Sequence, residues 1–202
     1  MIGAGLLAHI DIEKAQTVGS IWSFAGLNPD AVWIKGEKRP WNAQLKTLCW
    51  KIGESFVKLI NHKDSFYSQI YKERKVYEWN RNLAGQMTAA CEAKLSRFKI
   101  GKDTEAWLWY AGRVGPNAVR GYLERGESIV TSNCVNADES VLHPMLPPAH
   151  INERAKRYAV KLFLAHLHQR WYEERFGVSP PKPYILTQPG HTHHIEPPQV
   201  KL

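Results

Sequence analysis

The chain has 202 residues, 44% of them hydrophobic, and this composition excludes a globally disordered protein. The length suits one domain, or one domain with an insertion, that buries a substantial core. The 27 Lys and Arg residues outnumber the 19 Asp and Glu residues, and the resulting net charge of +8 attracts polyanions. Nucleic acid is therefore a candidate partner.

The cysteines indicate neither a disulfide framework nor a zinc ribbon. Cys49, Cys91 and Cys134 are far apart, their number is odd, and no CxxC pair occurs. No basic-then-apolar signal segment opens the chain, and no apolar run reaches the roughly 18 residues of a membrane span. We therefore expect a protein of the reducing cytoplasm with no membrane partner.

The first forty residues predict short helices joined by turns, the first over residues 2–10. Asp11 and Thr17 are candidate N-caps of the next two helices, because their side-chain oxygens can accept free backbone amides. Gly26 predicts a left-handed helix stop, and residues 30–40 are expected to form a loop or small hairpin.

Two long helices are expected in the middle of the chain. Asn42 is a candidate N-cap for a helix that continues through Ile60. The second helix spans Ser65 to about Phe98, with Gly85 as a weak point. Its length exceeds the usual globular range, so we expect it to project as an arm or to pair with another helix.

Glycines and prolines separate the elements of the C-terminal half. A proline-rich tail over residues 177–202 follows Gly177, which ends the last helix. The expected fold class is all-α: a helical nucleic-acid-binding domain over residues 1–176, with a long projecting helix and with residues 76–148 as an inserted middle segment. The later helices are expected from Asp103 to Ala111, around Asn117 to Arg125, and from His150 to Phe176.

One loop and the helix start after it combine cations with tryptophan. Basic side chains there can hold phosphates, and Trp41 offers a ring on which an unpaired base can stack. The alternative is a solvated loop with Trp33 and Trp41 tucked into the core. The candidate nucleic-acid-binding residues of this segment are Lys35, Lys38, Arg39, Trp41, Asn42 and Lys46.

Two further basic groups fall on predicted helices. Arg154, Arg157 and Lys161 are spaced to share one helix face. The other group lies beside tyrosines in the second long helix. Contact with nucleic acid and an ordinary solvated face are both open for each group. The candidates in the second group are Lys72, Arg74 and Lys75.

Other motifs give weaker indications. The Gly3-Ala4-Gly5 run is either a phosphate-facing turn or a tightly packed helix start. His191, His193 and His194 lie in the tail without a cysteine or carboxylate at ligand spacing, so we expect no specific metal site and no cofactor. No recognisable catalytic constellation occurs, which favours a binding protein over an enzyme.

Several patterns follow one another along the chain. They are Ile2-Gly3-x-Gly5 with Ala8-His9-Ile10, then Phe24-Ala25-Gly26-Leu27-x-Pro29, then Gly36-x-x-Arg39-x-x-Asn42-x-x-Leu45, and finally Arg154-Ala155-x-Arg157-x-Ala159-Val160-Lys161-Leu162. In this order they resemble the C-terminal domain of the insertion-sequence transposases that use a bridge RNA. The resemblance covers roughly residues 1–75 and 149–176.

The chain departs from those transposases at both of their reactive parts. Their nucleophilic serine follows the Gly-Leu-x-Pro motif, whereas residues 30–36 contain no serine. Only Met1 precedes Ile2, so the acidic residues of a RuvC-like domain are not expected.

The same domain is similar to the Nop domain of box C/D small-RNA ribonucleoproteins. It also resembles the RNA-binding part of the Tas proteins, effectors of the TIGR RNA-guided DNA-targeting systems of phages and bacteria, some of which have no nuclease domain. The resemblance implies a non-catalytic homodimer that binds a structured guide RNA and through it a target DNA.

Two other functions stay open on the sequence. One is a DNA-binding recombinase domain that uses a separate catalytic partner or an unrecognised serine such as Ser55 or Ser65. The other is a protein-interaction scaffold in which the predicted helix over residues 65–98 pairs in trans.

Overall fold

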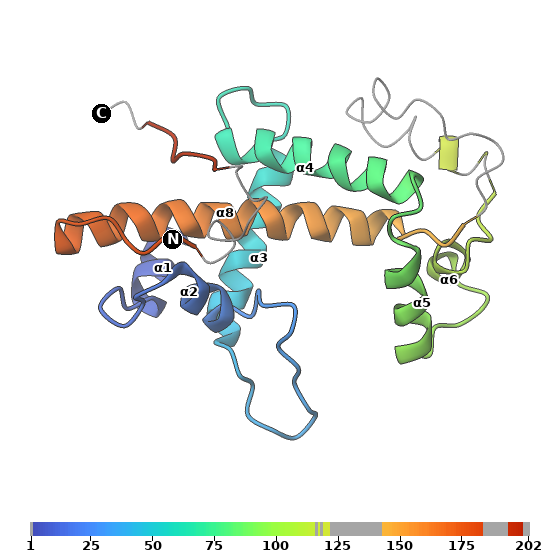
Figure 1. Ribbon diagram of the computed structural model, residues 1–202, viewed down its shortest axis with the longest axis horizontal. Helices are drawn as coiled ribbons and strands as arrows, with labels where there is room; N and C mark the ends of the chain where they lie inside the picture. Colours follow the sequence, from blue (N-terminus) through green and yellow to red (C-terminus); the bar gives the residue numbers. More distant parts are fainter. Residues whose placement is uncertain (1, 116, 118, 122–142, 184–193, 200–202) are drawn as a thin grey trace. The chain divides into compact units, whose positions relative to one another are not determined.

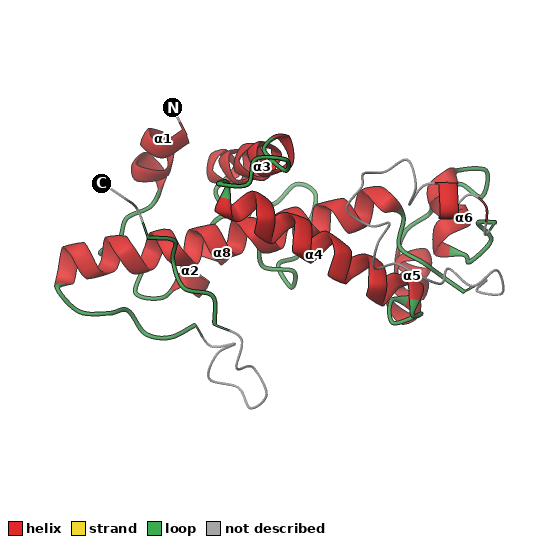
Figure 2. Ribbon diagram, turned by 90° about the horizontal axis from the view of Figure 1, so that it is seen from above, coloured by secondary structure: helices red, strands yellow, loops and turns green. Residues whose placement is uncertain are grey.

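The computed structural model describes residues 2–115, 117, 119–121, 143–183 and 194–199. Over these residues the secondary structure consists of helices and loops without a strand, so the expected all-α class is confirmed (Figure 2). The chain divides into two compact units, unit 1 (Met1–Ser68 and Arg157–Leu202) and unit 2 (Gln69–Lys156). Helices α4 (Phe66–Leu83) and α8 (Pro148–Phe176) contribute residues to both units.

Unit 1 contains α1 (Ile2–His9), α2 (Val18–Phe24), α3 (Ala43–Lys58) and the C-terminal part of α8 (Figure 1). Its core forms because each helix places apolar residues on one face at helical spacing. The largely buried core residues include Leu6, Val18, Ile21, Leu45, Cys49, Ile52, Phe56, Ala159, Val160 and Leu164.

Of the two glycines at the start of α1, Gly5 is closely packed and Gly3 is not. Both lie inside the helix, so the segment is not a phosphate-facing turn. A Cβ atom on Gly5 would lie only 2.8 Å from Cδ1 of Leu48, whereas nothing lies within 4 Å of a Cβ atom on Gly3. A larger residue at position 5 would therefore require the Leu48 side chain of α3 to move.

The segment between α1 and α2 is a turn, where the sequence predicted a second helix. Asp11 accepts a hydrogen bond from the Glu13 amide at 3.1 Å through its side chain and one from the Ala15 amide at 3.0 Å through its carbonyl oxygen. These bonds close a single turn that then leads into α2. His168 of α8 holds the turn by donating from Nε2 to the Ala15 carbonyl oxygen at 2.7 Å.

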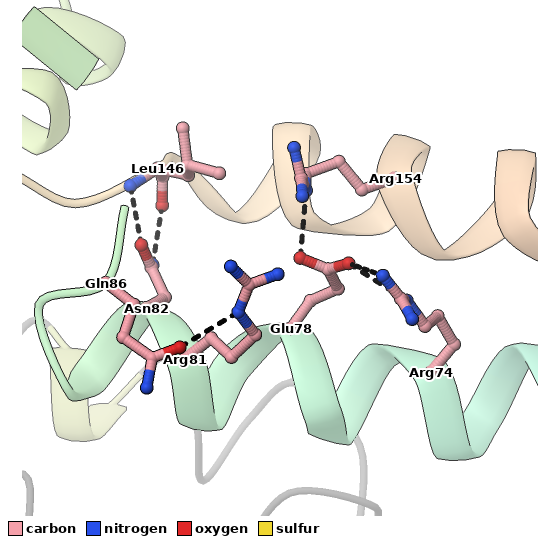
Figure 3. A network of polar contacts seen from close by, with 7 residues as sticks. All are labelled: Arg74, Glu78, Arg81, Asn82, Gln86, Leu146 and Arg154. Atoms are coloured by element: carbon pink, nitrogen blue, oxygen red, sulfur yellow. Dashed lines mark hydrogen bonds and ion pairs between the residues drawn. The ribbon is translucent and has the colours of Figure 1, made fainter. Parts of the chain in front are cut away.

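Unit 2 contains most of α4, then α5 (Thr88–Arg97), α6 (Glu105–Tyr110) and the N-terminal part of α8. Trp79 and Trp109 form the centre of its core, with ring centroids 6.1 Å apart and both side chains nearly fully buried. The buried Asn82 side chain donates to the Leu146 carbonyl oxygen at 3.0 Å and accepts from the Leu146 amide at 2.8 Å (Figure 3). Unit 2 includes the whole of the segment 76–148 that the sequence indicated as an insertion.

The single helix predicted from Ser65 to about Phe98 is two helices. Gly85 adopts a positive φ of 72°, and the Gln86 amide donates to the Arg81 carbonyl oxygen across it at 3.0 Å. This is the hydrogen-bond pattern of a Schellman motif, which ends α4 at its C-terminus. Gly85, which the sequence indicated as a weak point within one long helix, therefore ends α4. The described residues form no helical arm of the predicted length.

The other predicted helix boundaries agree closely with the structure. Asn42 caps α3, and Gly177, with a φ of 71°, follows the end of α8. Thr104 caps α6 in place of the neighbouring Asp103. The described residues 117 and 119–121 are helical, and the rest of the short helix expected there lies outside the described residues, as does much of the tail, including His191 and His193.

Candidate nucleic-acid interface

The loop between α2 and α3 is tied together at its base (Figure 1). Gly26, with a φ of 66°, ends α2 in the left-handed conformation that the sequence predicted. At the other end, the Asn42 amide donates to the Phe24 carbonyl oxygen at 2.8 Å. The Asn42 side-chain oxygen accepts from the amides of Gln44 and Leu45, each at 2.9 Å. Asn42 therefore fixes the start of α3, and its side-chain oxygen is already hydrogen-bonded within the chain.

Trp41 packs under Lys46 at this base. The Lys46 ammonium lies 4.1 Å from the ring centroid, a cation–π contact. A Cβ atom on Gly26 would lie 2.9 Å from Cγ of Trp41 and 3.1 Å from Cδ of Lys46. The glycine thus makes room for both side chains, and the half-buried Trp41 ring is held between it and the cation.

Trp33 and Arg39 form a second cation–aromatic pair farther along the loop. The Arg39 guanidinium carbon lies 5.3 Å from the Trp33 ring centroid. The indole nitrogen of Trp33 donates to the Glu37 carbonyl oxygen at 2.8 Å, which fixes the orientation of the ring.

A third pair joins α2 to α8. The Lys161 ammonium lies 4.7 Å from the Trp22 ring centroid, and the Trp22 indole nitrogen donates to the Lys161 carbonyl oxygen at 3.0 Å. Both side chains are half-buried. Residues far apart in the sequence are thereby brought to one place.

Two lysines of these pairs have lowered pKa values, caused first by burial and then by neighbouring cations. Burial lowers the pKa of Lys46, and the positive charges of Arg39 and Arg157 lower it further. Burial and the charge of Arg157 likewise lower the pKa of Lys161, and Asp30 offsets part of that effect. Residues from the loop, α3 and α8 therefore form one positively charged patch, which we call the basic-aromatic surface. Its members are Trp22, Trp33, Arg39, Trp41, Lys46, Arg157 and Lys161.

Lys35 and Lys38 extend this surface along the loop. Both side chains are exposed. Over the part of the chain that the structure describes, neither of them, nor Arg39 or Lys46, forms an ion pair with a carboxylate. The loop also carries two acidic residues, Asp30 and Glu37.

The basic candidates in unit 2 have a different environment (Figure 3). Arg74 donates from Nε and Nη2 to one oxygen of Glu78, at 2.9 and 2.6 Å, and Arg154 donates from Nε to the other at 2.8 Å. The Glu78 side chain is 1% exposed. Burial alone would raise its pKa, but the hydrogen bonds and charges of Arg154 and Arg74 outweigh burial and hold the pKa below its ordinary value. Arg74 and Arg154 therefore balance a buried charge.

The remaining candidates in unit 2 are also partly or wholly covered. Lys75 is only 6% exposed, and Lys72 is half-buried. The three-residue basic face predicted on the last helix thus has two kinds of environment. Arg154 is bonded within unit 2, whereas Arg157 and Lys161 belong to the basic-aromatic surface of unit 1.

Trp22 and Trp33 are functional candidates that the sequence prediction did not include. Trp22 follows the apolar spacing of α2 and therefore has the pattern of a core residue. Trp33 lies in an apolar run, Val32-Trp33-Ile34, inside a loop that also carries charged residues, and this was the signal that could have singled it out.

Among the described residues, the candidate nucleophiles Ser55 and Ser65 form hydrogen bonds, and the thiols of Cys49 and Cys91 are buried. The Ser55 hydroxyl donates to the Lys51 carbonyl oxygen in its own helix at 3.0 Å, and the Ser65 and Ser68 hydroxyls pair at 2.6 Å. Burial raises the pKa of Cys49 and of Cys91 to about 11, which keeps both thiols protonated at neutral pH. Among the described residues, no group of three or more His, Cys, Asp or Glu side chains is placed to hold a metal ion.

No described helix combines the length and the apolar character that a membrane crossing requires. No family model, curated protein or solved structure matches the chain.

Proposed function

We propose that the protein binds a structured RNA through the basic-aromatic surface, without cutting or joining it. The observation that carries this proposal is that Arg39, Lys46 and Lys161 each lie over a tryptophan ring. Burial is the first cause of the lowered pKa values of Lys46 and Lys161, and the positive charge of Arg157 lowers both further, so like charges lie near each lysine.

A phosphate backbone is the ligand that relieves this repulsion. Each phosphate placed among the cations replaces repulsion with attraction and releases condensed counterions. The three tryptophan rings add flat apolar surface beside the cations. Single-stranded loops and bulges of folded RNA offer splayed bases that stack on such rings, whereas the bases of a duplex are already stacked. The combination therefore favours folded RNA over duplex DNA.

The resemblance to the Tas proteins makes a guide RNA the expected ligand. In that case base pairing between the guide RNA and DNA would select the target, and the protein would act within an RNA-guided DNA-targeting ribonucleoprotein. The resemblance also implies a homodimer, which the molar mass of the purified protein in solution tests directly.

The test is to recover the RNA from the protein itself. The protein would be purified from cells that also carry the DNA flanking its gene, and the bound RNA would be sequenced. We expect one RNA species, encoded nearby, that stays bound through a high-salt wash. The charge-reversed variant Arg39→Glu/Lys46→Glu, purified in parallel, should lose it. Recovery of random fragments that a low-salt wash removes, or tighter binding of duplex DNA than of the RNA, would contradict the proposal.

A further inference from the structure

The tip of the α2–α3 loop exposes three consecutive apolar side chains. Val32, Trp33 and Ile34 are 63%, 38% and 60% exposed. Exposed apolar residues in a row are unusual unless a partner covers them. The rest of the loop is basic, so the partner must suit both an apolar ring and positive charge.

We infer that Trp33 is a stacking platform for one unpaired nucleotide of the RNA. This inference rests on the proposed function. It makes the Trp33 ring, at the loop tip, the feature that distinguishes unpaired from paired nucleotides. Trp41 is not given this role, because its ring is held between Gly26 and Lys46.

The Trp33 ring is held in place before any ligand arrives. Its indole nitrogen donates to the Glu37 carbonyl oxygen, and the Glu37 amide donates back to the Ile34 carbonyl oxygen at 3.1 Å. These two bonds close the tip of the loop on itself. A ring that is already oriented loses little conformational entropy when a base stacks on it, so the bonds favour binding.

Charge complementarity points to a nucleotide. The Arg39 guanidinium lies over the Trp33 ring, Lys35 lies within the turn at the tip, and Lys38 follows that turn. In the described part of the chain, none of these three cations is ion-paired with a carboxylate. A base stacked on Trp33 brings its own phosphates to these cations, which a neutral apolar partner cannot do.

The experiment compares two RNA probes of equal length, an unpaired strand and a fully paired hairpin. Trp33→Leu keeps an apolar side chain but removes the aromatic ring, and Trp33→Phe restores a smaller ring. A stacked base contributes about 1–3 kcal/mol, so Trp33→Leu should weaken binding of the unpaired strand about 5- to 150-fold. Binding of the paired hairpin should change less than about twofold, and Trp33→Phe should recover most of the affinity.

Phe98 provides a matched control in unit 2. It is an exposed aromatic residue with Lys94 and Arg97 over its ring, at 4.1 and 5.3 Å from the centroid. Phe98→Leu should leave the affinity for both probes unchanged.

Three outcomes would overturn the inference. If Trp33→Leu binds both probes as tightly as the parent protein does, no base stacks on Trp33. Equal losses on both probes that Trp33→Phe does not restore would give Trp33 a role in loop structure alone. If Trp33→Leu loses binding to phosphatidylcholine–phosphatidylserine vesicles but keeps its RNA affinity, the loop tip binds a lipid surface and not a nucleotide. If the parent protein binds neither RNA probe, the proposed function itself has failed.

Discussion

Two groups of basic residues, one in each unit, have different kinds of partner. In unit 2, Arg74 and Arg154 direct their donors to the buried carboxylate of Glu78. In unit 1, Arg39 and Lys46 lie over tryptophan rings, and no carboxylate pairs with them among the described residues. Both groups look alike in the sequence, as short runs of cations beside aromatic residues.

The nature of the partner decides whether a cation can serve a ligand. A ring face attracts the cation without accepting its N–H groups in ordinary hydrogen bonds, so those donors remain for a phosphate. A buried carboxylate accepts the donors and cancels the charge. Moving Arg74 or Arg154 to a phosphate would remove one of the two counter-charges of the buried Glu78, at a cost of several kcal/mol. We therefore assign Arg74 and Arg154 to stability, and the cations of the basic-aromatic surface remain the ones proposed for binding.

Among the substitutions that test this division of roles, Glu78→Gln should have the largest effect, and that effect should be on stability. Removing one member of a buried charge cluster should lower the free energy of unfolding by about 3 kcal/mol, measured from urea-induced loss of helical circular dichroism. The RNA affinity of the folded variant should stay unchanged. The control is Glu13→Gln, which removes the exposed ion pair with Arg175 and should cost less than about 1 kcal/mol. A large loss of RNA affinity by folded Glu78→Gln would contradict the division of roles.

Gly26→Ala should displace Trp41 and Lys46, which pack against Gly26 in the basic-aromatic surface. The left-handed backbone alone costs a non-glycine residue about 1–2 kcal/mol, and the new methyl group would also overlap the Trp41 ring. We expect lower stability together with weaker RNA binding, because Lys46 moves with the ring. Gly36→Ala separates the two causes: its φ is 98°, but nothing lies within 4 Å of the added Cβ atom. If both variants bind RNA equally well, the position of Trp41 does not matter for binding.

The parts of the fold that depend on local chemistry could be predicted from the sequence. The Asn42 cap and the left-handed stop at Gly26 each need only a few neighbouring residues, and both agree with the structure. Gly85 shows the limit of this reasoning. A glycine within a helical pattern is compatible with a continuous helix or with a stop, and packing of the following segment decides between them.

The partners of the charged residues could not be predicted, because they are distant in the sequence. Arg154 bonds to Glu78 across 76 positions, and Trp22 to Lys161 across 139. Helical spacing predicts that Arg154, Arg157 and Lys161 share one helix face, but it does not reveal that the buried Glu78 carboxylate bonds Arg154. The division of the candidate cations into two environments is therefore a property of the tertiary structure.

The units should also differ in their response to acid. Burial lowers the pKa of His168 from its ordinary 6.5, so below that pH the unfolded chain takes up a proton that the folded protein resists. The stability that His168 contributes is complete above pH 6.5 and is lost as the pH falls toward the folded-state pKa. The pKa of Glu78 lies below its ordinary 4.5, so the corresponding loss in unit 2 begins only in stronger acid.

His168→Gln tests this difference, since an amide can still donate to the Ala15 carbonyl oxygen. The unfolding midpoint of the variant, measured by circular dichroism between about pH 5 and pH 8, should depend less on pH than that of the parent protein. Parallel curves for the parent and His168→Gln would mean that His168 takes up its proton as easily in the folded chain as in the unfolded one.

The smallest effect on stability, and the sharpest on binding, is expected from Lys38→Ala/Arg39→Ala. Each lost phosphate contact lowers the slope of log affinity against log salt concentration by about 0.7–0.9, so the pair should lower it by about 1.4–1.8. Lys94→Ala/Arg97→Ala removes the same charge from unit 2, where both cations also lie over an aromatic ring. If the loop contacts the RNA, only the first pair changes the slope, because counterion release follows contacts and not net charge. Equal changes in slope for both double variants would mean that RNA binding responds to net charge alone and not to contacts of the basic-aromatic surface. An unchanged slope for both would mean that the loop does not contact the RNA.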